Sequence, residues 1–345
     1  MATLREGRIS GASISVLAAR HCNQSCRGCV AFSPVMPPSF ADIDAVRRDL
    51  SRLAAVYHAR AARVQGGEPL LHPELPRLLR EVRRAAIADR IVVLTNGRLL
   101  SEMPAAFWSA VDEVRVSAYP SSEPRREQLA DWRRKALAHG ADLIVVSFDA
   151  FRENYSANGS ADPALVRRIY AACEEAHALR CHVAWDGYFY KCTRAVSGSA
   201  ADGVPEPGAE RVNGVTIGEG PELGPRLAAY LAARDPLPAC RRCLGTVGRM
   251  APHGMVPRSA WRESLAGRTE DLVDWDYLAR VERGRSDIYL RPVGEIDVAA
   301  FRGPVPRPLR AAVRVLSRRR WRLLLAAPLT AAIRRHRGTG AGPRG

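Results

Sequence analysis

The sequence predicts an α/β protein whose main sheet is built from parallel strands. Through the first half of the chain, short apolar runs alternate with longer stretches of helical periodicity, which is typical of repeated βαβ units. Polar or glycine-rich motifs directly follow three of these apolar runs. Because the carboxyl ends of parallel strands meet at one edge of a sheet or barrel, we expect these motifs to form one site.

The expected elements alternate in order along the first 180 residues. The strands are Ile14–Ala18, Ala62–Gln65, Arg90–Thr95, Asp112–Tyr119 and Ala141–Phe148. Helical periodicity covers Ala41–Tyr57, a stretch from about Pro73, and Pro163–Leu179. Helices also precede the strands that begin at Asp112 and Ala141. Five strands are well defined and a sixth is not, so the pattern fits either a barrel or an open sheet.

The pattern changes after residue 180. The stretch CHVAWDGYFYKC predicts a β-hairpin with Asp186-Gly187 in a type I′ turn. A Gly/Pro-rich loop and a helix near residues 222–234 then lead to Cys240 and Cys243. We therefore expect three regions: a first domain over residues 1–180, a cysteine-anchored module over 181–250, and an extension with a basic helical tail over 251–345.

Composition places the chain among globular proteins. Its 345 residues are 47% hydrophobic and 26% charged, and no run of 18 apolar residues predicts a membrane span. The N-terminus lacks the apolar segment of a signal peptide. We expect a cytoplasmic location, where thiols stay reduced and clustered cysteines are more often metal ligands than disulfides.

The net charge of +16 comes mostly from the C-terminal end. Residues 302–345 contain twelve arginines and no acidic residue, so the rest of the chain carries only +4. The simplest interpretation is a solvated basic helix packed on the protein. Alternatives are a landing site for an acidic protein or a phosphorylated or lipid-linked substrate, and a membrane-surface helix. A nucleic-acid arm is the weakest alternative, since no nucleic-acid recognition fold is predicted elsewhere.

Three of the eight cysteines, Cys22, Cys26 and Cys29, lie in the loop after the first strand. Thiolates are soft ligands that select zinc, copper or iron–sulfur clusters. A tetrahedral site has four ligands, so this triplet leaves one position open. From the cysteines alone, a structural zinc site completed by a distant residue such as His21 or His72 remains an alternative. The motif Gly66-Gly67-Glu68-Pro69 follows the second strand, and its glycines allow a close backbone approach.

A C-x3-C-x2-C loop after a first strand, followed by GGEP after the second, resembles the radical S-adenosylmethionine (radical SAM) enzymes. The resemblance covers roughly residues 8–250 and implies a partial (β/α)5–6 TIM-like barrel in the first domain. It implies that Cys22, Cys26 and Cys29 bind three irons of a [4Fe–4S] cluster, whose fourth iron binds S-adenosylmethionine. One electron from the cluster then releases a 5′-deoxyadenosyl radical, which abstracts hydrogen from a C–H bond.

The same resemblance implies how the cosubstrate is held. Backbone carbonyls of the GGEP motif, together with Glu68, would receive the methionine ammonium group. Ser117 and Arg115 share the polar face of their strand and would bind the methionine carboxylate. Asn96 would bind the ribose hydroxyls, unless it serves only as an Asn-Gly turn.

One position departs from the family pattern. Many radical SAM enzymes carry an aromatic residue just before the third cysteine, next to the adenine. Here that residue is Gly28. We expect Phe32 to take its place.

The remaining cysteines resemble the twitch or SPASM-type modules that follow some radical SAM enzymes. By this resemblance, Cys181, Cys192, Cys240 and Cys243 bind an auxiliary [4Fe–4S] cluster, although four thiolates suit structural zinc equally well. Cys173 is then left over on a predicted helix. It is either a buried apolar residue or the hydrogen donor of a radical epimerase. If the auxiliary cluster used three thiolates, one of the four would be the donor instead.

The layout resembles radical SAM enzymes that modify sugars, aminocyclitols or nucleosides in natural-product pathways, antibiotic biosynthesis among them. Epimerisation of a carbinol centre with a cysteine hydrogen donor is the favoured reaction. The alternative for the same substrates is dehydrogenation to a ketone, with the auxiliary cluster as electron acceptor. A peptide-modifying maturase is less favoured, because only 21 residues precede the first cysteine and leave no room for a leader-binding domain. A structural zinc protein with a basic interaction arm is the hypothesis from another class. An enzyme of this kind needs an electron donor such as flavodoxin or ferredoxin.

Overall fold

The computed structural model describes residues 3–5, 8–198, 208–285, 294–297 and 311–315. The predicted helical tail falls outside these residues, apart from the short stretch 311–315. Within the described residues, no helix is both long and apolar enough to cross a membrane.

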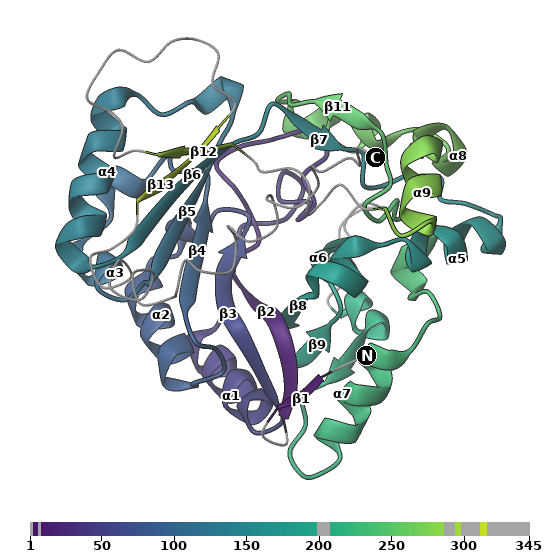
Figure 1. Cartoon of the computed structure of the whole chain (residues 1–345), viewed down its shortest axis with the longest axis horizontal. Coiled ribbons are helices and arrows are strands. Elements are labelled where there is room, and N and C mark those ends of the chain that lie inside the picture. The colour runs from purple at the N-terminus through teal and green to yellow at the C-terminus, as the bar shows by residue number, and fades with distance from the viewer. Residues whose placement is uncertain (1–2, 6–7, 199–207, 286–293, 298–310, 316–345) are drawn as a thin grey trace, which may run out of the picture.

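One large sheet organises the molecule, with its strands in the order β10-β9-β8-β2-β3-β4-β5-β6-β13-β12 (Figure 1). Six neighbouring strands in it run parallel. These are β8 (Cys181–Trp185), β2 (Arg8–Ala19), β3 (Tyr57–Gly66), β4 (Ile91–Thr95), β5 (Glu113–Ala118) and β6 (Asp142–Ser147). The predicted α/β class is confirmed, and the fanned parallel strands are those of a partial TIM-like barrel.

Shorter strands complete the edges of this sheet. At one edge, β9 (Tyr188–Tyr190) and β10 (Gly214–Thr216) are antiparallel, and β1 (Thr3–Arg5) pairs with the start of β2. At the other edge, β13 (Ala311–Val315) is antiparallel to β6 and parallel to β12 (Gly294–Asp297). A separate two-stranded sheet joins β7 (Ala150–Arg152) to β11 (Met250–Pro252).

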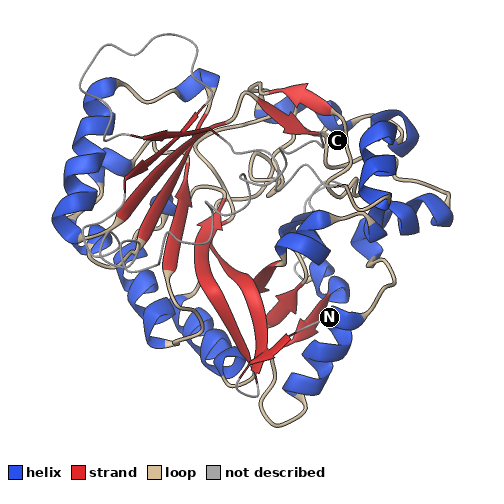
Figure 2. Ribbon diagram, in the orientation of Figure 1, coloured by secondary structure: helices blue, strands red, loops and turns tan. Residues whose placement is uncertain are grey.

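The helices form two groups (Figure 2). The first group follows the outer side of the fanned strands and consists of α1 (Ile43–Ala54), α2 (Leu75–Arg84), α3 (Ala105–Trp108) and α4 (Arg126–His139). The second group lies on the other side of the molecule and consists of α5 (Pro163–Ala171), α6 (Thr193–Ser197), α7 (Leu223–Ala232), α8 (Thr269–Leu272) and α9 (Trp275–Glu282). Local capping fixes some of the ends. Asp42 accepts backbone N–H groups at the start of α1, and Gly140, in the left-handed region, ends α4.

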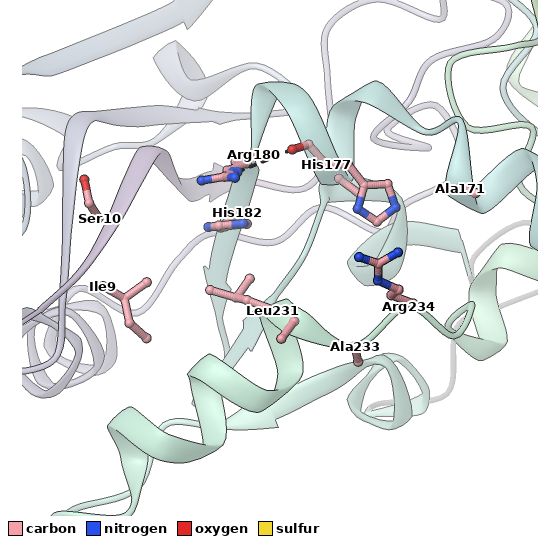
Figure 3. Close-up of a pocket in the computed structure, with 11 residues that line it drawn as sticks. Ile9, Ser10, Ala171, His177, Arg180, His182, Leu231, Ala233 and Arg234 are labelled. Carbon is pink, nitrogen blue, oxygen red and sulfur yellow. Dashed lines mark hydrogen bonds between the residues drawn. The ribbon is translucent and has the colours of Figure 1, made fainter. Parts of the chain in front are cut away.

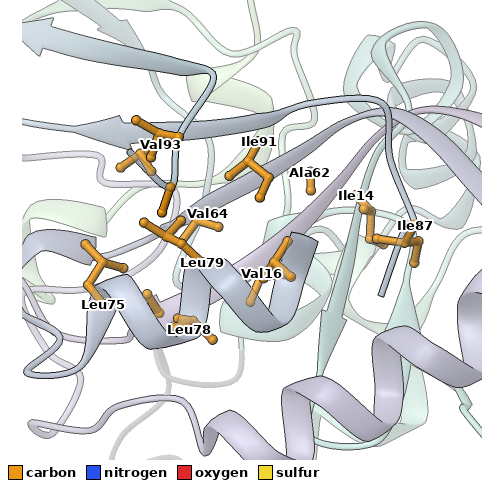
Figure 4. Close-up of a cluster of buried hydrophobic side chains, with 14 of the residues drawn as sticks. Ile14, Val16, Ala62, Val64, Leu75, Leu78, Leu79, Ile87, Ile91 and Val93 are labelled. Atoms are coloured by element: carbon orange, nitrogen blue, oxygen red, sulfur yellow. The ribbon is translucent and has the colours of Figure 1, made fainter. Parts of the chain in front are cut away.

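Strand alternation divides the sheet into two different faces. One face packs against the helices of the first group: Val16, Val64 and Val93 contact the apolar side of α2 (Figure 4). Each fully buried side chain of this kind contributes about 2 kcal/mol. The residues between them, such as Ser15 on β2 and Gln65 on β3, point to the opposite side, which we call the inner face.

The predicted hairpin is confirmed, but its place in the fold was not foreseen. Asp186 and Gly187 both have positive φ, 48° and 74°, as a type I′ turn requires. Strand β8 of the hairpin pairs in parallel with β2, so the hairpin extends the main sheet and supplies its sixth parallel strand. The helix expected over residues 163–179 is also different, because α5 ends at Ala171 and a π-helical turn, η4 (Glu175–Leu179), follows it.

Candidate active site

The three cysteines of the first motif lie in the loop that follows β2, which we call the cluster loop (residues 20–36). Burial, and then the neighbouring thiols of Cys29 and Cys22, raise the pKa of Cys26 to about 12. The sulfur of Cys22 lies 3.4 Å from the backbone nitrogen of Gln24 and 3.6 Å from Nδ2 of Asn96, and both nitrogens donate toward it. The three thiols are thus grouped, with N–H donors positioned for a thiolate.

The two glycines of the GGEP motif allow the end of β3 to pack closely against the cluster loop. The backbone nitrogen of Gly67 donates to the carbonyl of Ala19 at 2.7 Å, and that of Glu68 donates to His21 at 3.1 Å. A Cβ on Gly66 would lie 2.0 Å from the Ala19 carbonyl oxygen, and one on Gly67 would lie 2.0 Å from that of His21. These glycines thus allow a close backbone approach to the cluster loop, while their contact with the cosubstrate stays a prediction.

Glu68 has a different environment from the one the sequence suggested. It is fully buried, and its carboxylate accepts hydrogen bonds from the Thr95 hydroxyl at 2.6 Å and from the backbone nitrogens of Asn96 and Leu70 at 2.8 and 3.1 Å. Burial raises its pKa to about 7. The carboxylate therefore ties the GGEP motif, whose Pro69 opens the short helix Pro69–Leu71, to the end of β4 and has no surface to offer an ammonium group. Of the expected ammonium contacts, only the backbone carbonyls of the motif stay a prediction.

Asn96 is both a turn residue and a neighbour of the cluster loop. Its Oδ1 accepts the backbone nitrogen of Arg98 at 3.0 Å, and Gly97 has a φ of 80°. Its Nδ2 donates to Oδ1 of Asn23 at 2.7 Å, next to Cys22. The side chain thus joins the end of β4 to the cluster loop, while its contact with ribose stays a prediction.

Strand β5 alternates as predicted. Val114 and Val116 are in the hydrophobic core, so Arg115 and Ser117 lie on the inner face. The guanidinium of Arg115 forms an ion pair with Glu113 at 2.6 Å. The roles of Arg115 and Ser117 toward a methionine carboxylate stay predictions.

A segment far along the chain covers the cluster loop and was not recognised from the sequence. We call residues 253–261 the clamp segment. The indole Nε1 of Trp261 donates to the carbonyl of Cys26 at 2.8 Å, and the backbone nitrogen of Val256 donates to the carbonyl of Ser25 at 3.0 Å. Arg258 donates to the carbonyls of Cys22 and Pro34. No local motif marks this segment, since more than 220 residues separate it from the loop that it holds.

The second cysteine group differs from the prediction in one member. Cys173, Cys192, Cys240 and Cys243 line one small cavity. Burial, and then the Cys243 thiol, raise the pKa of Cys173 to about 12. Burial and then Glu175 raise the pKa of Cys192, with further contributions from the thiols of Cys173 and Cys243. Cys181 is elsewhere: it faces Ser13 in the β2–β8 pairing, and its sulfur lies 3.2 Å from the Arg63 guanidinium. The structure thus groups Cys173, expected to be spare, and leaves out Cys181, expected to be a ligand.

Two buried cations accompany these four thiols. The Nζ of Lys191 donates to the Tyr170 hydroxyl at 2.7 Å and to the carbonyl of Ala233 at 2.8 Å. Burial lowers the pKa of Lys191, while the thiols of Cys240 and Cys192 raise it. Arg194 is also buried and pairs with Glu175. Positive charge beside buried thiols favours their thiolate form, which metal binding requires.

The protein-family model described as the radical SAM superfamily matches residues 16–190, which include the cluster loop, the GGEP motif and β5.

The chain belongs to the radical SAM superfamily.

Individual relatives are more distant. A GTP 3′,8-cyclase from Chlorobaculum tepidum is 34% identical over 98 residues, which cover 28% of this chain and 29% of that protein. A probable GTP 3′,8-cyclase from Metallosphaera sedula is 32% identical over 71 residues, 20% of this chain and 22% of that protein. The chain thus spans less than a third of the length of these curated relatives.

Solved structures of low identity also match. BtrN in complex with AdoMet and 2-DOIA has a TM-score of 0.37 at 14% identity and covers 65% of this chain and 82% of that one. Native anSMEcpe with AdoMet and the Cp18Cys peptide has a TM-score of 0.32 at 13% identity, covering 41% and 44%. SuiB from Streptococcus suis has a TM-score of 0.26 at 13% identity, covering 41% of each chain.

The donors of the cluster loop fit the radical SAM [4Fe–4S] cluster. Such a cluster takes its protein ligands one per iron, at separate corners of a cube, and three thiols from one loop supply three of them. In the part of the chain that the structure describes, no three His, Cys, Asp or Glu side chains converge on a single metal ion. The N–H groups directed at Cys22 suit a metal-bound thiolate.

Phe32 does not occupy the position expected beside adenine. It has no exposed surface and packs edge-to-face with Tyr155 and Trp261, at ring-centroid distances of 5.0 and 5.5 Å. It is therefore part of the core that joins the cluster loop to the clamp segment. Gly28 has a φ of 66°, which explains why this radical SAM chain has glycine rather than an aromatic residue there.

Proposed function

We propose that this radical SAM enzyme oxidises a carbinol carbon of a sugar-type small molecule, a carbohydrate, aminocyclitol or nucleoside, to a ketone. The observation that carries the proposal is that Cys173, Cys192, Cys240 and Cys243 line one cavity. Four thiolates complete the ligand set of a [4Fe–4S] cluster, which suits it to electron transfer. Because Cys173 belongs to this group, its thiol would be a cluster ligand rather than the hydrogen donor of an epimerase.

The inner face of the sheet supports a substrate rich in hydroxyl groups. Gln65 on β3 and Ser117 on β5 lie on this face near the carboxyl ends of their strands, and both are only half-buried. Arg63 and Arg115 lie on the same face of their strands. Hydroxyl, amide and guanidinium groups together offer the donors and acceptors that a polyol needs.

When bound, the first cluster and S-adenosylmethionine supply a 5′-deoxyadenosyl radical that takes the hydrogen atom of the carbinol carbon. A ketone then forms when that carbon loses one electron and its hydroxyl loses a proton. The four-thiol group would hold the acceptor of that electron, with Lys191 and Arg194 offsetting its negative charge. The clamp segment and the GGEP glycines fix the cluster loop and exclude water from its buried side.

A second candidate reaction is epimerisation with Cys181 as the hydrogen donor. The observation in its favour is that Cys181 lies on the inner face, in contact with Arg63. The position of Cys181 along the sheet argues against this reaction. Cys181 is level with Ser13, six residues before the end of β2, which corresponds to about 20 Å along the strand from the cluster loop. Dehydrogenation is therefore the reaction that the geometry supports better.

The first test uses anaerobically reconstituted protein with S-adenosylmethionine, dithionite and a panel of sugars, aminocyclitols and nucleosides in deuterated water. We expect 5′-deoxyadenosine in the wild type and none in the Cys26→Ala variant, together with a ketone that carries no solvent deuterium. Recovered epimer with deuterium at one carbon would support the Cys181 reaction instead. Turnover with peptides alone would show that the substrate is a peptide and contradict the proposed sugar-type substrate. A colourless protein that holds zinc would contradict the proposal altogether.

A further inference from the structure

A second cavity, of about 510 Å³, lies at the opposite end of the strands from the cluster loop (Figure 3). Ile9 at the start of β2 and His182 near the start of β8 form part of its wall. The end of α7 adds Leu231 and Arg234, and the turn after α5 adds His177 and Arg180. Since the cluster loop follows the carboxyl end of β2, this cavity is separate from the radical site.

The polar side of the cavity is cationic. Figure 3 shows Arg180, His177 and Arg234 close together, with His182 beside Arg180. The Nδ1 of His182 lies 2.8 Å from the buried hydroxyl of Tyr57. Burial lowers the pKa of His182 to about 3, so this ring is neutral and offers hydrogen bonds rather than charge.

The electrostatics around His177 have the same sign. Its Nε2 lies 2.9 Å from the carbonyl of Tyr170. After burial, the charges that lower its pKa are those of Lys191, Arg180 and Arg234. Three cations around one histidine create a positive potential that an anion entering the cavity would neutralise.

The rest of the cavity lining is mostly apolar. Ile9 and Leu231 face it, together with small alanine side chains from α7 and the turn after α5. A free inorganic anion would leave this surface in contact with water. A larger molecule with an apolar or flat organic part would cover it.

We propose that this cavity binds a small phosphate ester. The phosphate group would be held by Arg180 and Arg234, whose guanidinium groups match its oxygens, with His177 and His182 as further polar contacts. The organic part of the ester would lie on Ile9 and Leu231. This site does not depend on the proposed function, because it uses none of the residues of the radical site.

The cavity lies beside the second cysteine group. Ala176 lines both cavities, and Ala233, which lines the phosphate-ester cavity, accepts the hydrogen bond from Lys191. A bound ester would therefore lie one layer of side chains away from the four thiols. It would not compete with S-adenosylmethionine, whose site is at the other end of the strands.

The test is calorimetric titration of the iron-loaded protein with phenyl phosphate, beside inorganic phosphate, benzoate and phenol. We expect one saturable site, with phenyl phosphate bound at least about tenfold more tightly than each of the other three probes. Saturating S-adenosylmethionine should leave this affinity unchanged. Arg234→Ala should weaken binding by about tenfold or more, since it removes a charge-assisted contact. Arg226→Ala, on the same helix but with its guanidinium directed to the Thr216 carbonyl, should leave binding as in the wild type.

Several results would overturn the proposal. One is weak binding at many sites that is unaffected by Arg234→Ala, which would indicate the arginines of the C-terminal tail. Another is competition between phenyl phosphate and S-adenosylmethionine. Equal affinity for benzoate would remove the preference for phosphate. Because Arg234 is exposed at a helix end, its variant is expected to fold, and circular dichroism checks this.

Discussion

Cys173 and Cys181 are close in sequence, yet their thiols face different parts of the molecule. Cys173 follows α5 and shares a cavity with three other cysteines, whereas Cys181 begins β8 and contacts Arg63. Both are buried, and alanine is nearly as small as cysteine, so the two alanine variants form a matched pair. The pair separates a metal ligand from a buried thiol.

This pair gives the first prediction. In a chain whose Cys22, Cys26 and Cys29 are replaced by alanine, only the auxiliary cluster can form. There, Cys173→Ala should lower the iron bound after reconstitution and change the visible absorption, because it removes one of the four ligands. Cys181→Ala should keep the iron of its parent. Loss of iron in Cys181→Ala, with Cys173→Ala unaffected, would restore the ligand set expected from the sequence.

His182 gives a prediction about pH. Its folded-state pKa is about 3 and its unfolded value is near 6.5, so the unfolded chain binds more protons between these values. The free energy of unfolding therefore decreases as the pH falls below about 6.5, and protonation of this histidine lowers it by about 1.4 kcal/mol at pH 5.5. In urea unfolding at pH 7.5 and 5.5, His182→Gln should lose less stability than the wild type. Equal losses in the two proteins would contradict this assignment.

At the scale of elements, the contact between β3 and the cluster loop depends on glycine. In Gly67→Ala, the new Cβ would lie 2.0 Å from the His21 carbonyl oxygen and 2.9 Å from the Ser33 hydroxyl, so the cluster loop must move. We expect this variant to bind less iron and to form no 5′-deoxyadenosine. Gly140→Ala is the control, since its position at the end of α4 has open space and a φ of 72°. It should cost about 1 kcal/mol of stability and leave iron loading intact.

The clamp segment is a second element that acts on the cluster loop. Trp261→Phe removes the N–H that donates to the Cys26 carbonyl, a loss of about 1 kcal/mol. We expect a chelator to bleach the iron–sulfur absorption about fivefold faster than in the wild type. Trp275→Phe is matched chemically, because Trp275 donates to the Glu270 carbonyl at 3.1 Å but is exposed and lies on α9, outside the clamp segment. Equal bleaching rates in the two variants would show that the clamp segment does not hold the loop.

At the scale of the whole molecule, the sequence predicted local elements correctly but did not predict which distant segments contact one another. The five strands follow from apolar periodicity, and the Asp186-Gly187 turn follows from its dipeptide, because both depend on neighbouring residues. That β8 pairs with β2 could not be read, since chain order does not say which edge of a sheet a later strand joins. The same limit explains Cys173 and Cys181, whose spacing is compatible with either as the fourth ligand. It also explains the clamp segment and Glu68, whose partners come from other strands and loops.

The distribution of charge along the chain gives the last prediction. Twelve arginines lie in residues 302–345, and a chain that ends after Val315 loses eight of them. If the tail attracts an acidic reductant, flavodoxin should reduce the shortened chain about tenfold more slowly at low salt. Dithionite, a small reductant, should reduce both proteins at similar rates. Because exposed charges are screened beyond about 10 Å at 0.1 M salt, the advantage of the full chain should disappear as salt is added. Equal flavodoxin rates at low salt would instead favour a tail that serves a membrane surface or a charged substrate.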